Sequence, residues 1–394
     1  MLNSTTAKLP RMYRLLFGYG LSVIADTSVY IVFAVWAKQL TNSTSSAGLV
    51  FFCFIIPSLI SPLTGNLIDS LRKDSVIVFT NIFMALSILV LLHSRQSNQY
   101  YLLLITAFIY GLGYVIFNSA RVCLVVQTYE EKHIGKINAV LRTIREAFRL
   151  SSPILGLFIF TTFGSDIFVY FVSISLLLSS FLFLKFNKET ENYSHIDPFS
   201  FKGLMEGVLS LWRNYILRAS ITCLSITLLV AGFYEIILFS ILEHLNQPLS
   251  LIGQLISSQG LGAVIGGLFS MKLIQHIAPV KLVGIGLIIQ SIGVLGLFSQ
   301  EIGMIYISCT IFGFGAPVSM VGLDTIIQTT LPYDIQGRVN TALESITSIP
   351  FSLSFLLSSL LASLISYKIM LCFMVIITFL SSVYLLIHIR KIKK

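Results

Sequence analysis

The chain has 394 residues, of which 55% are hydrophobic and only 11% are charged, and its mean hydropathy is +0.88. A soluble domain carries about 25% charged residues, so this composition excludes an ordinary soluble protein. The formal net charge of +9 would indicate a nucleic-acid partner only if the basic residues gathered on a soluble surface. The composition therefore predicts a polytopic α-helical membrane protein.

Twelve apolar segments are long enough to cross a bilayer, because a spanning helix needs about 20 mostly apolar residues. In chain order we expect these spans at residues 13–37, 47–68, 75–93, 101–127, 138–163, 166–186, 216–242, 250–271, 282–299, 302–328, 340–365 and 369–389. The first span follows a basic stretch, as a secretory signal would. Its apolar run is too long for a signal and contains Asp26, so we expect it to remain in the mature protein.

Most of the 26 lysine and arginine residues fall on the side of these spans that carries both chain ends. Basic loops stay in the cytoplasm, so we expect both termini to be cytoplasmic. The basic balance is then a feature of topology, and no nucleic-acid partner is expected. A multi-pass protein of a bacterial inner (plasma) membrane, acting as a monomer, fits this pattern.

A motif after the second predicted span carries a family resemblance. The segment "GNLIDSLRK" resembles the G-x-x-x-D-x-x-R-K loop of the major facilitator superfamily. The matching residues are Gly65, Asp69, Arg72 and Lys73. The segments "FNSARVCLVVQTYEEKHIGKINAV", "SSPILG", "GLMEGVLSLWRNYILR" and "IQTTLPYDIQGRVNT" are similar to its macrolide-efflux and enterobactin-exporter-like subgroup. The second-half counterpart of the loop, "GLFSMK", lacks the acidic residue.

The resemblance implies twelve transmembrane helices in two six-helix bundles, which work by alternating access. It also implies that the loop after the second span is a gate that meets the start of span eleven, where a helix N-terminus favours a carboxylate. The alternative is that its basic residues only anchor the cytoplasmic side.

In this family, spans 1, 4, 7 and 10 line the central cavity, and here each holds an ionisable residue: Asp26, Arg121, Glu235 and Asp324. A charge at the bilayer centre costs about 2.5 to 3.5 kcal/mol, so such residues usually face a cavity and carry function. Acids in a low-dielectric cavity can bind and release protons near neutral pH. We expect Asp26 and Glu235 to be the leading proton-coupling residues, with Asp324 a third candidate. Permanent salt bridges or mouth positions are the alternative.

The second half of the chain aligns with the first half when it is shifted by 202 residues, and this alignment places Arg121 opposite Leu323. Because Leu323 is the neighbour of Asp324, we expect Arg121 and Asp324 at similar depths in the membrane. One hypothesis is that the two approach each other across the cytoplasmic part of the cavity and separate with the bundles. A structural pair within one bundle is the alternative.

Four charged residues share one face of the fifth predicted span, at i, i+3, i+4 and i+7: Arg142, Arg145, Glu146 and Arg149. Arginines four residues apart repel unless another group neutralises them. A substrate carboxylate would do so, because guanidinium groups bind carboxylates bidentately. The substrate-binding candidates are therefore Arg121, Arg145, Arg149 and Glu146. Alternatively, these arginines reach the headgroups or pair with protein acids.

The least hydrophobic stretch separates six predicted spans from six. We therefore expect an N-terminal bundle at 1–186, a cytoplasmic linker with an amphipathic helix at 187–215, and a C-terminal bundle at 216–394. The 202-residue offset places "GKINAVLRTI" opposite "GRVNTALESI", and the glycines of "GLG" opposite those of "GFG". Duplicated six-helix units are typical of transporters whose halves rock around a central site.

The chain lacks the phosphate-binding loop, the zinc-type His-Glu-x-x-His run and the G-x-S-x-G elbow, so we expect no enzyme, cofactor or metal site. Energy must then come from a gradient. The leading interpretation is a proton-coupled exporter of amphiphilic small molecules of drug or siderophore type. The alternatives are a carrier of an anionic metabolite or polycarboxylate siderophore in either direction, and a membrane receptor or scaffold without transport. The expected partners are a small-molecule substrate, protons and the lipid bilayer.

Overall fold

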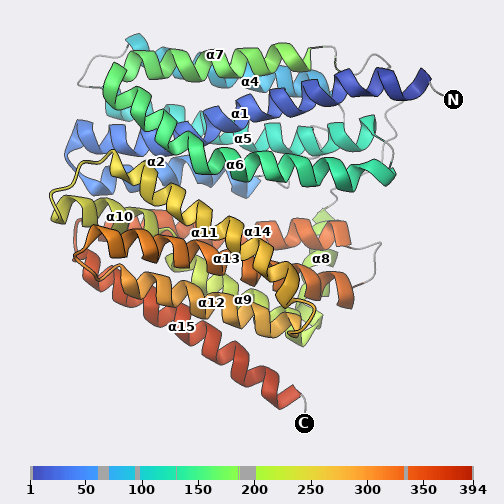
Figure 1. Cartoon of the computed structure of the whole chain (residues 1–394), viewed down its shortest axis with the longest axis vertical. Helices are drawn as coiled ribbons and strands as arrows, with labels where there is room; N and C mark the ends of the chain where they lie inside the picture. Colours follow the sequence, from blue (N-terminus) through green and yellow to red (C-terminus); the bar gives the residue numbers. More distant parts are fainter. Residues whose placement is uncertain are drawn as a thin grey trace. The chain divides into compact units, whose positions relative to one another are not determined.

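A computed structural model describes residues 3–60, 71–93, 98–129, 131–184, 186, 201–331 and 336–392. Every regular element within these ranges is helical (Figure 1). This confirms the predicted all-α membrane fold.

Nine helices of the described ranges are long and apolar enough to cross a bilayer. Two shorter apolar helices, Thr44–Leu59 and Ser345–Leu361, coincide with the second and eleventh predicted spans. The fifth predicted span falls in a long helix that carries the arginine face and contains Pro153. The count of twelve spans and the cytoplasmic orientation of the termini stay predictions.

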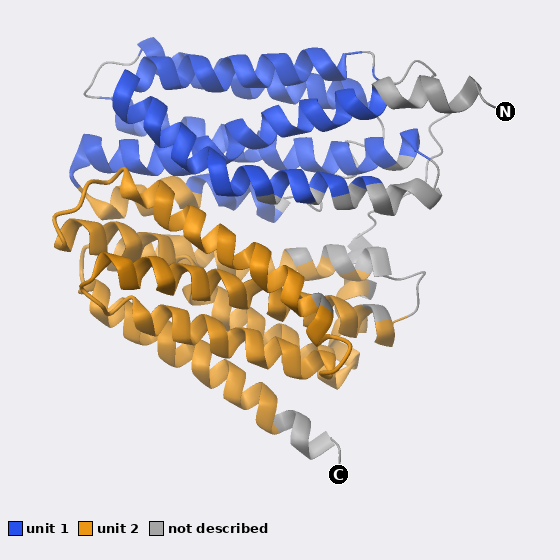
Figure 2. Ribbon diagram, in the orientation of Figure 1, with its two compact units in different colours: residues 1–42, 53–199 blue, residues 43–52, 200–394 orange. Residues whose placement is uncertain are grey.

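The chain divides into two compact units, coloured in Figure 2: unit 1 contains residues 1–42 and 53–199, and unit 2 contains residues 43–52 and 200–394. The division after residue 199 falls inside the predicted linker. Residues 43–52 differ from the predicted boundaries, which place them in the N-terminal bundle. They group with unit 2 because the ring of Phe51 packs edge-on against Phe239 and at a tilt against Phe355 there, at ring-centroid distances of 6.3 and 5.4 Å.

The described residues of unit 1 form five long helices and two short 3-10 segments. Their bounds are α1 Asn3–Thr41, η1 Ile56–Ile60, α4 Lys73–Leu89, η2 Val90–His93, α5 Gln99–Thr128, α6 Glu131–Phe163 and α7 Ser165–Phe183. Helix α2, Thr44–Ile55, begins in unit 2 and ends in unit 1. Within unit 1, α1 packs against α5, α6 and α7, and α4 packs against α5 and α7. Helix α1 thus contacts three of the other four long helices of the unit.

Polar side chains link three of these helices inside the apolar core of unit 1. Asn81 of α4 donates a hydrogen bond to Ser179 of α7 at 3.0 Å, and Ser179 donates to the backbone carbonyl of Gly18 on α1 at 2.7 Å. Both side chains of this relay are shielded from solvent, because Asn81 and Ser179 are fully buried. Buried polar groups that satisfy one another in this way fix the register of the packed helices.

Arg14 of α1 caps the end of α7. Its Nε donates to the carbonyl of Leu182 at 3.0 Å, and a terminal nitrogen donates to the carbonyl of Leu184 at 2.7 Å. The last carbonyls of a helix lack intrahelical partners and carry partial negative charge, so a guanidinium satisfies both needs. The same group lies over the ring of Phe186, 5.5 Å from its centroid.

Eight helices lie wholly within unit 2 in the part of the chain that the structure describes. They are α8 Phe201–Arg213, α9 Tyr215–Ala231, α10 Phe233–His244, α11 Leu251–Leu273, α12 Pro279–Gly296, α13 Ile302–Thr330, α14 Gln336–Leu361 and α15 Tyr367–Ile392. Helix α13 packs closely against α11 and α12, while α14 packs against α8 and α9. The predicted amphipathic helix of the linker corresponds to α8, which groups with unit 2.

Glycines let helices approach backbone to backbone in both units. A Cβ on Gly111 of α5 would lie 2.1 Å from the carbonyl oxygen of Phe54, and a Cβ on Gly313 of α13 would lie 1.9 Å from that of Gln259. These two glycines are the pair that the 202-residue offset aligns. In each unit, therefore, the aligned glycine supports an equally close helix contact, which only glycine allows.

Candidate functional site

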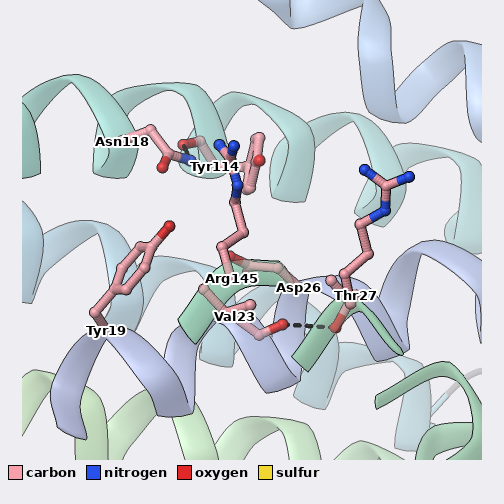
Figure 3. A pocket seen from close by; sticks show the side chains of 8 residues that line it. Tyr19, Val23, Asp26, Thr27, Tyr114, Asn118 and Arg145 are labelled. Atoms are coloured by element: carbon pink, nitrogen blue, oxygen red, sulfur yellow. Dashed lines mark hydrogen bonds between the residues drawn. The ribbon is translucent and has the colours of Figure 1, made fainter. Parts of the chain in front are cut away.

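A cavity of about 340 Å³ lies inside unit 1, between helices α1, α5 and α6. Its lining is Tyr19, Val23, Asp26, Thr27, Tyr114, Asn118, Arg145 and Arg149. Figure 3 shows that Asp26, Tyr114 and Arg145, which come from three different helices, converge on this space. The cavity thus combines aromatic, amide, carboxylate and guanidinium groups within a membrane-spanning bundle.

Helical periodicity explains why these residues share one cavity. Tyr19, Val23 and Asp26 are spaced i, i+4 and i+7 on α1, so they lie on one face. Tyr114 and Asn118 are four residues apart on α5, as are Arg145 and Arg149 on α6. Because α1 packs against both α5 and α6, these three polar faces meet.

Asp26 is buried, with 5% of its surface exposed, and both of its oxygens are near hydroxyl donors. Tyr110 of α5 donates a hydrogen bond to Oδ1 at 2.8 Å, and Ser22 donates to Oδ2 at the longer distance of 3.5 Å. Hydroxyl donors stabilise a carboxylate in its charged form, whereas burial favours its neutral form. Asp26 is therefore placed where a proton could be held or released inside the bundle.

Two of the predicted arginines line the same cavity from α6. Arg145 and Arg149 are both half-buried. Their guanidinium groups give the cavity two positive charges beside the single carboxylate of Asp26 among its described lining residues. Arg145 and Arg149 of the predicted arginine face thus line a cavity inside unit 1.

Arg121 lies next to the cavity, with its guanidinium carbon 4.9 Å from the centroid of the Tyr19 ring. Tyr19 lines the cavity and also stacks on Phe117, at 6.4 Å between centroids. The Nε atom of Arg121 is buried, and no hydrogen-bond acceptor reaches it from the described part of the chain. A ring face compensates a cation only partly, so Arg121 retains the capacity to donate a further hydrogen bond.

The remaining charged candidates lie elsewhere. Glu235 is in the first turn of α10, half-buried, with its Oε2 atom buried in unit 2. Asp324 of α13 is exposed, and its role as the third proton-coupling candidate stays a prediction. Arg121 belongs to unit 1 and Asp324 to unit 2, and their suggested pairing stays a prediction. The side chain of Glu146 lies outside the described residues.

Half of the expected gate motif can be located. Arg72 precedes α4 and forms a salt bridge with Asp74 at 3.1 Å, while the buried Lys73 donates to the carbonyl of Leu71 at 3.1 Å. Gly65 and Asp69 lie outside the described residues. The role of this loop as a gate stays a prediction.

Sequence reasoning missed several members of the site, most of all Tyr110, Ser22 and Asn118. A signal for them was present. Tyr110, Tyr114 and Asn118 recur every four residues on α5, and Ser22 stands four residues before Asp26 on α1. Polar residues repeated at helical spacing within an apolar span indicate a face turned toward a cavity or another helix.

Comparison with known proteins places nearly the whole chain in one family. The family model described as the Major Facilitator Superfamily matches residues 15–241 and 220–394. An uncharacterized MFS-type transporter of Bacillus subtilis (strain 168), YvqJ, is 24% identical over 326 residues, covering 78% of this chain and 75% of that protein. The resemblance to the macrolide-efflux and enterobactin-exporter-like subgroup stays a prediction.

Solved structures of similar fold cover nearly the full length of the chain. A bacterial homologue of the iron transporter ferroportin, in an inward-facing state, superposes with a TM-score of 0.76 at 16% identity, covering 96% of this chain and 98% of the other. A bacterial metal transporter superposes with a TM-score of 0.69 at 17% identity, covering 95% and 97%. At these identities the structures show a shared fold alone. With the family match and the multi-pass helical architecture, the chain belongs to the Major Facilitator Superfamily and is a membrane transporter of that type.

Proposed function

We propose that the protein is a proton-coupled secondary transporter that exports amphiphilic small molecules across a bacterial inner membrane by alternating access. The observation that carries this proposal is the buried carboxylate of Asp26 inside a cavity lined by aromatic and charged side chains. The direction of transport rests on the resemblance of the sequence to exporters.

The cavity suits a small organic molecule with both apolar and polar parts. Its volume of about 340 Å³ falls in the range of roughly 300 to 1,000 Å³ that is common for small-molecule sites. Tyr19 and Tyr114 offer rings for stacking, while Asn118 and Thr27 offer hydrogen-bonding groups. A substrate with a ring and one or two polar groups would match this lining.

Asp26 supports the coupling to protons. A proton and a substrate influence each other's binding directly when their sites are adjacent, and Asp26 is itself part of the cavity lining. Tyr110 and Ser22 hold the carboxylate in place by hydrogen bonds. Both bonds form within unit 1, so a motion of unit 1 as a rigid body leaves them intact. Glu235 is a further coupling candidate from unit 2.

The test begins with identifying what the protein moves. Small molecules released by a deletion strain and by its complement are compared by mass spectrometry, with and without an uncoupler. Purified protein is then placed in vesicles that contain a pH-sensitive dye, and proton flux is recorded when an identified compound is added. We expect coupled flux for the native protein, none for Asp26→Asn, and native flux for Asp166→Asn, an exposed acid in the first turn of α7.

Native proton-coupled flux in Asp26→Asn would overturn the coupling role of this residue. Uncoupler-insensitive release of the compound would overturn proton coupling altogether.

A second candidate function, a carrier of an anionic metabolite or polycarboxylate siderophore, is favoured by Arg145 and Arg149. Two guanidinium groups facing one carboxylate leave the described cavity lining with positive charge. Arginine binds carboxylates and phosphates with two parallel hydrogen bonds, which adds both energy and orientation. An acidic substrate would therefore bind better than a cationic one of equal size.

Charge reversal separates the two candidates. If Arg145→Glu leaves the export of neutral and cationic drugs unchanged but abolishes transport of an acidic metabolite, the anion carrier is supported. If drugs are affected and the acidic metabolite is not, the anion carrier is excluded.

The donor set of the cavity favours organic substrates over bare metal ions. The two similar solved structures are described as an iron-transporter homologue and a metal transporter, but divalent metals need several oxygen, nitrogen or sulfur ligands. Here the described lining supplies one carboxylate beside two arginines. Among described residues, no group of three or more His, Cys, Asp and Glu residues could hold a metal. Vesicles containing a metal-sensing dye should accordingly show no Mn²⁺ or Fe²⁺ entry.

A further inference from the structure

Helix α8 presents an apolar stripe that no described residue covers. Met205, Leu209 and Trp212 are spaced i, i+4 and i+7, and they are 51%, 51% and 44% exposed. Three large apolar side chains on one face of a short helix form a continuous surface. Such a surface indicates an interaction site when its neighbours are polar.

The opposite face of α8 is already packed within unit 2. Gly207 and Leu211 are buried, and Leu211 belongs to the apolar core that also contains Leu217 of α9 and Val339 of α14. Because this face holds α8 against α9 and α14, the helix cannot rotate to bury the stripe. The stripe therefore stays on the surface of unit 2.

Chain continuity places the stripe at the edge of the membrane. Helix α8 ends at Arg213, and Asn214 caps the next helix by accepting hydrogen bonds from the backbone of Ile216 and Leu217 at 3.0 and 3.2 Å. The candidate span Tyr215–His244 begins one residue later. Trp212 thus lies within one helical turn of the point where the chain enters the bilayer.

The residues around the stripe match the headgroup region of a membrane. Arg213 and Arg218 are exposed cations, and Arg218 lies over the ring of Tyr215 at 5.5 Å from its centroid. Trp and Tyr are enriched at membrane interfaces because their rings are apolar and their tips polar. Exposed arginines at the same level attract the phosphates of anionic lipids.

We infer that α8 is an interfacial helix that inserts Met205, Leu209 and Trp212 at the boundary between headgroups and acyl chains. Arg213 and Arg218 bind anionic phospholipid headgroups beside it. An amphipathic helix of this kind lies in the plane of the membrane surface and responds to its lipid composition. The helix thereby gives unit 2 a fixed contact with lipid at the start of α9.

The tryptophan content of the chain makes this inference testable in the intact protein. The chain has two tryptophans, and Trp36 is a buried residue of α1 with 5% exposure. In a Trp36→Phe background, Trp212 becomes the sole tryptophan reporter. The protein is reconstituted in vesicles of phosphatidylglycerol and phosphatidylcholine in which one lipid at a time carries brominated acyl chains.

We expect brominated lipid to quench most of the Trp212 emission, and iodide in the aqueous phase to quench little of it. Strong quenching by iodide with none by brominated lipid would place the stripe in water and overturn the inference. Protection from both quenchers would show that protein covers the stripe, either another segment or a second copy, and would overturn it equally.

The choice of lipid is tested separately. Brominated phosphatidylglycerol should quench more effectively than brominated phosphatidylcholine at equal mole fraction. The two arginines favour anionic lipid by about 10- to 30-fold, so Arg213→Gln with Arg218→Gln should remove most of this preference. Lys281→Gln, which changes an exposed cation at the start of α12, should keep it. Equal quenching by both lipids in the native sequence would exclude anionic headgroups as the partner.

Discussion

The two units share a packing scheme but differ in the chemistry placed on it. Gly111 of unit 1 and Gly313 of unit 2 are aligned by the 202-residue offset, and each lies against a backbone carbonyl of a neighbouring helix. The two units carry different residues at the position just before each of these glycines. Tyr110 donates a hydrogen bond to Asp26, whereas Phe312 stacks on Tyr234 with ring centroids 4.2 Å apart.

The divergence continues along the polar faces of the cavity. The residues of unit 1 at these positions are Tyr114, Asn118, Arg121, Arg145 and Arg149, and the same offset places Ala316, Met320, Leu323, Thr347 and Phe351 opposite them. The two units therefore share the glycines that bring helices together, whereas the ionisable residues around the cavity lie in unit 1. Glycine contacts tolerate no change of size, whereas residues that face a cavity can change with the chemistry required of them.

The largest expected effect tests the shared packing. A methyl group on Gly111 or Gly313 would meet a carbonyl oxygen at 2.1 or 1.9 Å, so Gly111→Ala and Gly313→Ala should each destabilise the fold by about 3 kcal/mol. Thermal unfolding of the purified protein in detergent measures this loss. Gly267→Ala is the control, because nothing lies within 4 Å of its added methyl group. Similar melting temperatures for the three variants would contradict the shared close packing.

The next effect tests the difference between the units. Arg145→Thr gives unit 1 the residue that unit 2 has at Thr347, and it removes a charged donor from the cavity. For an acidic substrate we expect KM to rise about 10- to 100-fold, because a hydrogen bond to a charged group contributes about 1.5 to 3 kcal/mol. Uptake into vesicles measures it.

The matched change in unit 2 is Thr347→Ala, which removes a hydroxyl that bonds to the carbonyl of Leu343 in its own helix. Its KM should stay near the native value. A rise equal to that of Arg145→Thr would show that the aligned positions of both units contact the substrate.

A smaller effect tests the support of Asp26. Tyr110→Phe gives α5 the residue found at Phe312 and removes the 2.8 Å hydrogen bond to the carboxylate. Loss of one such bond to a carboxylate, at about 1.5 kcal/mol, should slow proton-coupled transport by about tenfold. The dye-loaded vesicles provide the measurement, with Tyr101→Phe as control because that ring is 66% exposed on the same helix. Equal transport rates in both variants would show that Tyr110 does not support the function of Asp26.

The smallest effect concerns stability local to unit 1. Arg14→Gln removes two hydrogen bonds to the last carbonyls of α7, which should cost about 1 kcal/mol. Hydrogen exchange should become faster in the last turn of α7 and stay unchanged in unit 2. Lys368→Gln, an exposed lysine at the start of α15, should alter neither region. A uniform increase across both units would indicate a global loss of stability instead.

Much of the fold was predictable because transmembrane helices have a distinctive composition. Long apolar runs with few charges have few alternatives to a transmembrane helix, so the helical class and the approximate spans followed from hydropathy. The assignment of residues 43–52 to unit 2 did not follow, because it depends on how Gly48 and Phe51 fit Ser359 and Phe355, far away in the sequence. Hydropathy carries no information about such partners.

The candidate site was predictable in part for a similar reason. Asp26, Arg145 and Arg149 stood out because a charge is costly in an apolar span. Tyr110 and Asn118 are uncharged, so placing them in an apolar span costs less free energy. They did not stand out, although they lie on one helical face. Asp324 stood out equally but is exposed, since cost within a span says nothing about which way a side chain points.

The relay from Asn81 through Ser179 to the carbonyl of Gly18 bears on how Asp26 can move. It joins α4, α7 and α1 in the buried core, and Asp26 lies about two turns beyond Gly18 on α1. Sliding α1 past its neighbours would break the bond to Gly18 and leave the buried hydroxyl of Ser179 without its acceptor in an apolar interior. The carboxylate is therefore expected to change its access by travelling with the three helices as one block, not by the motion of its own helix alone.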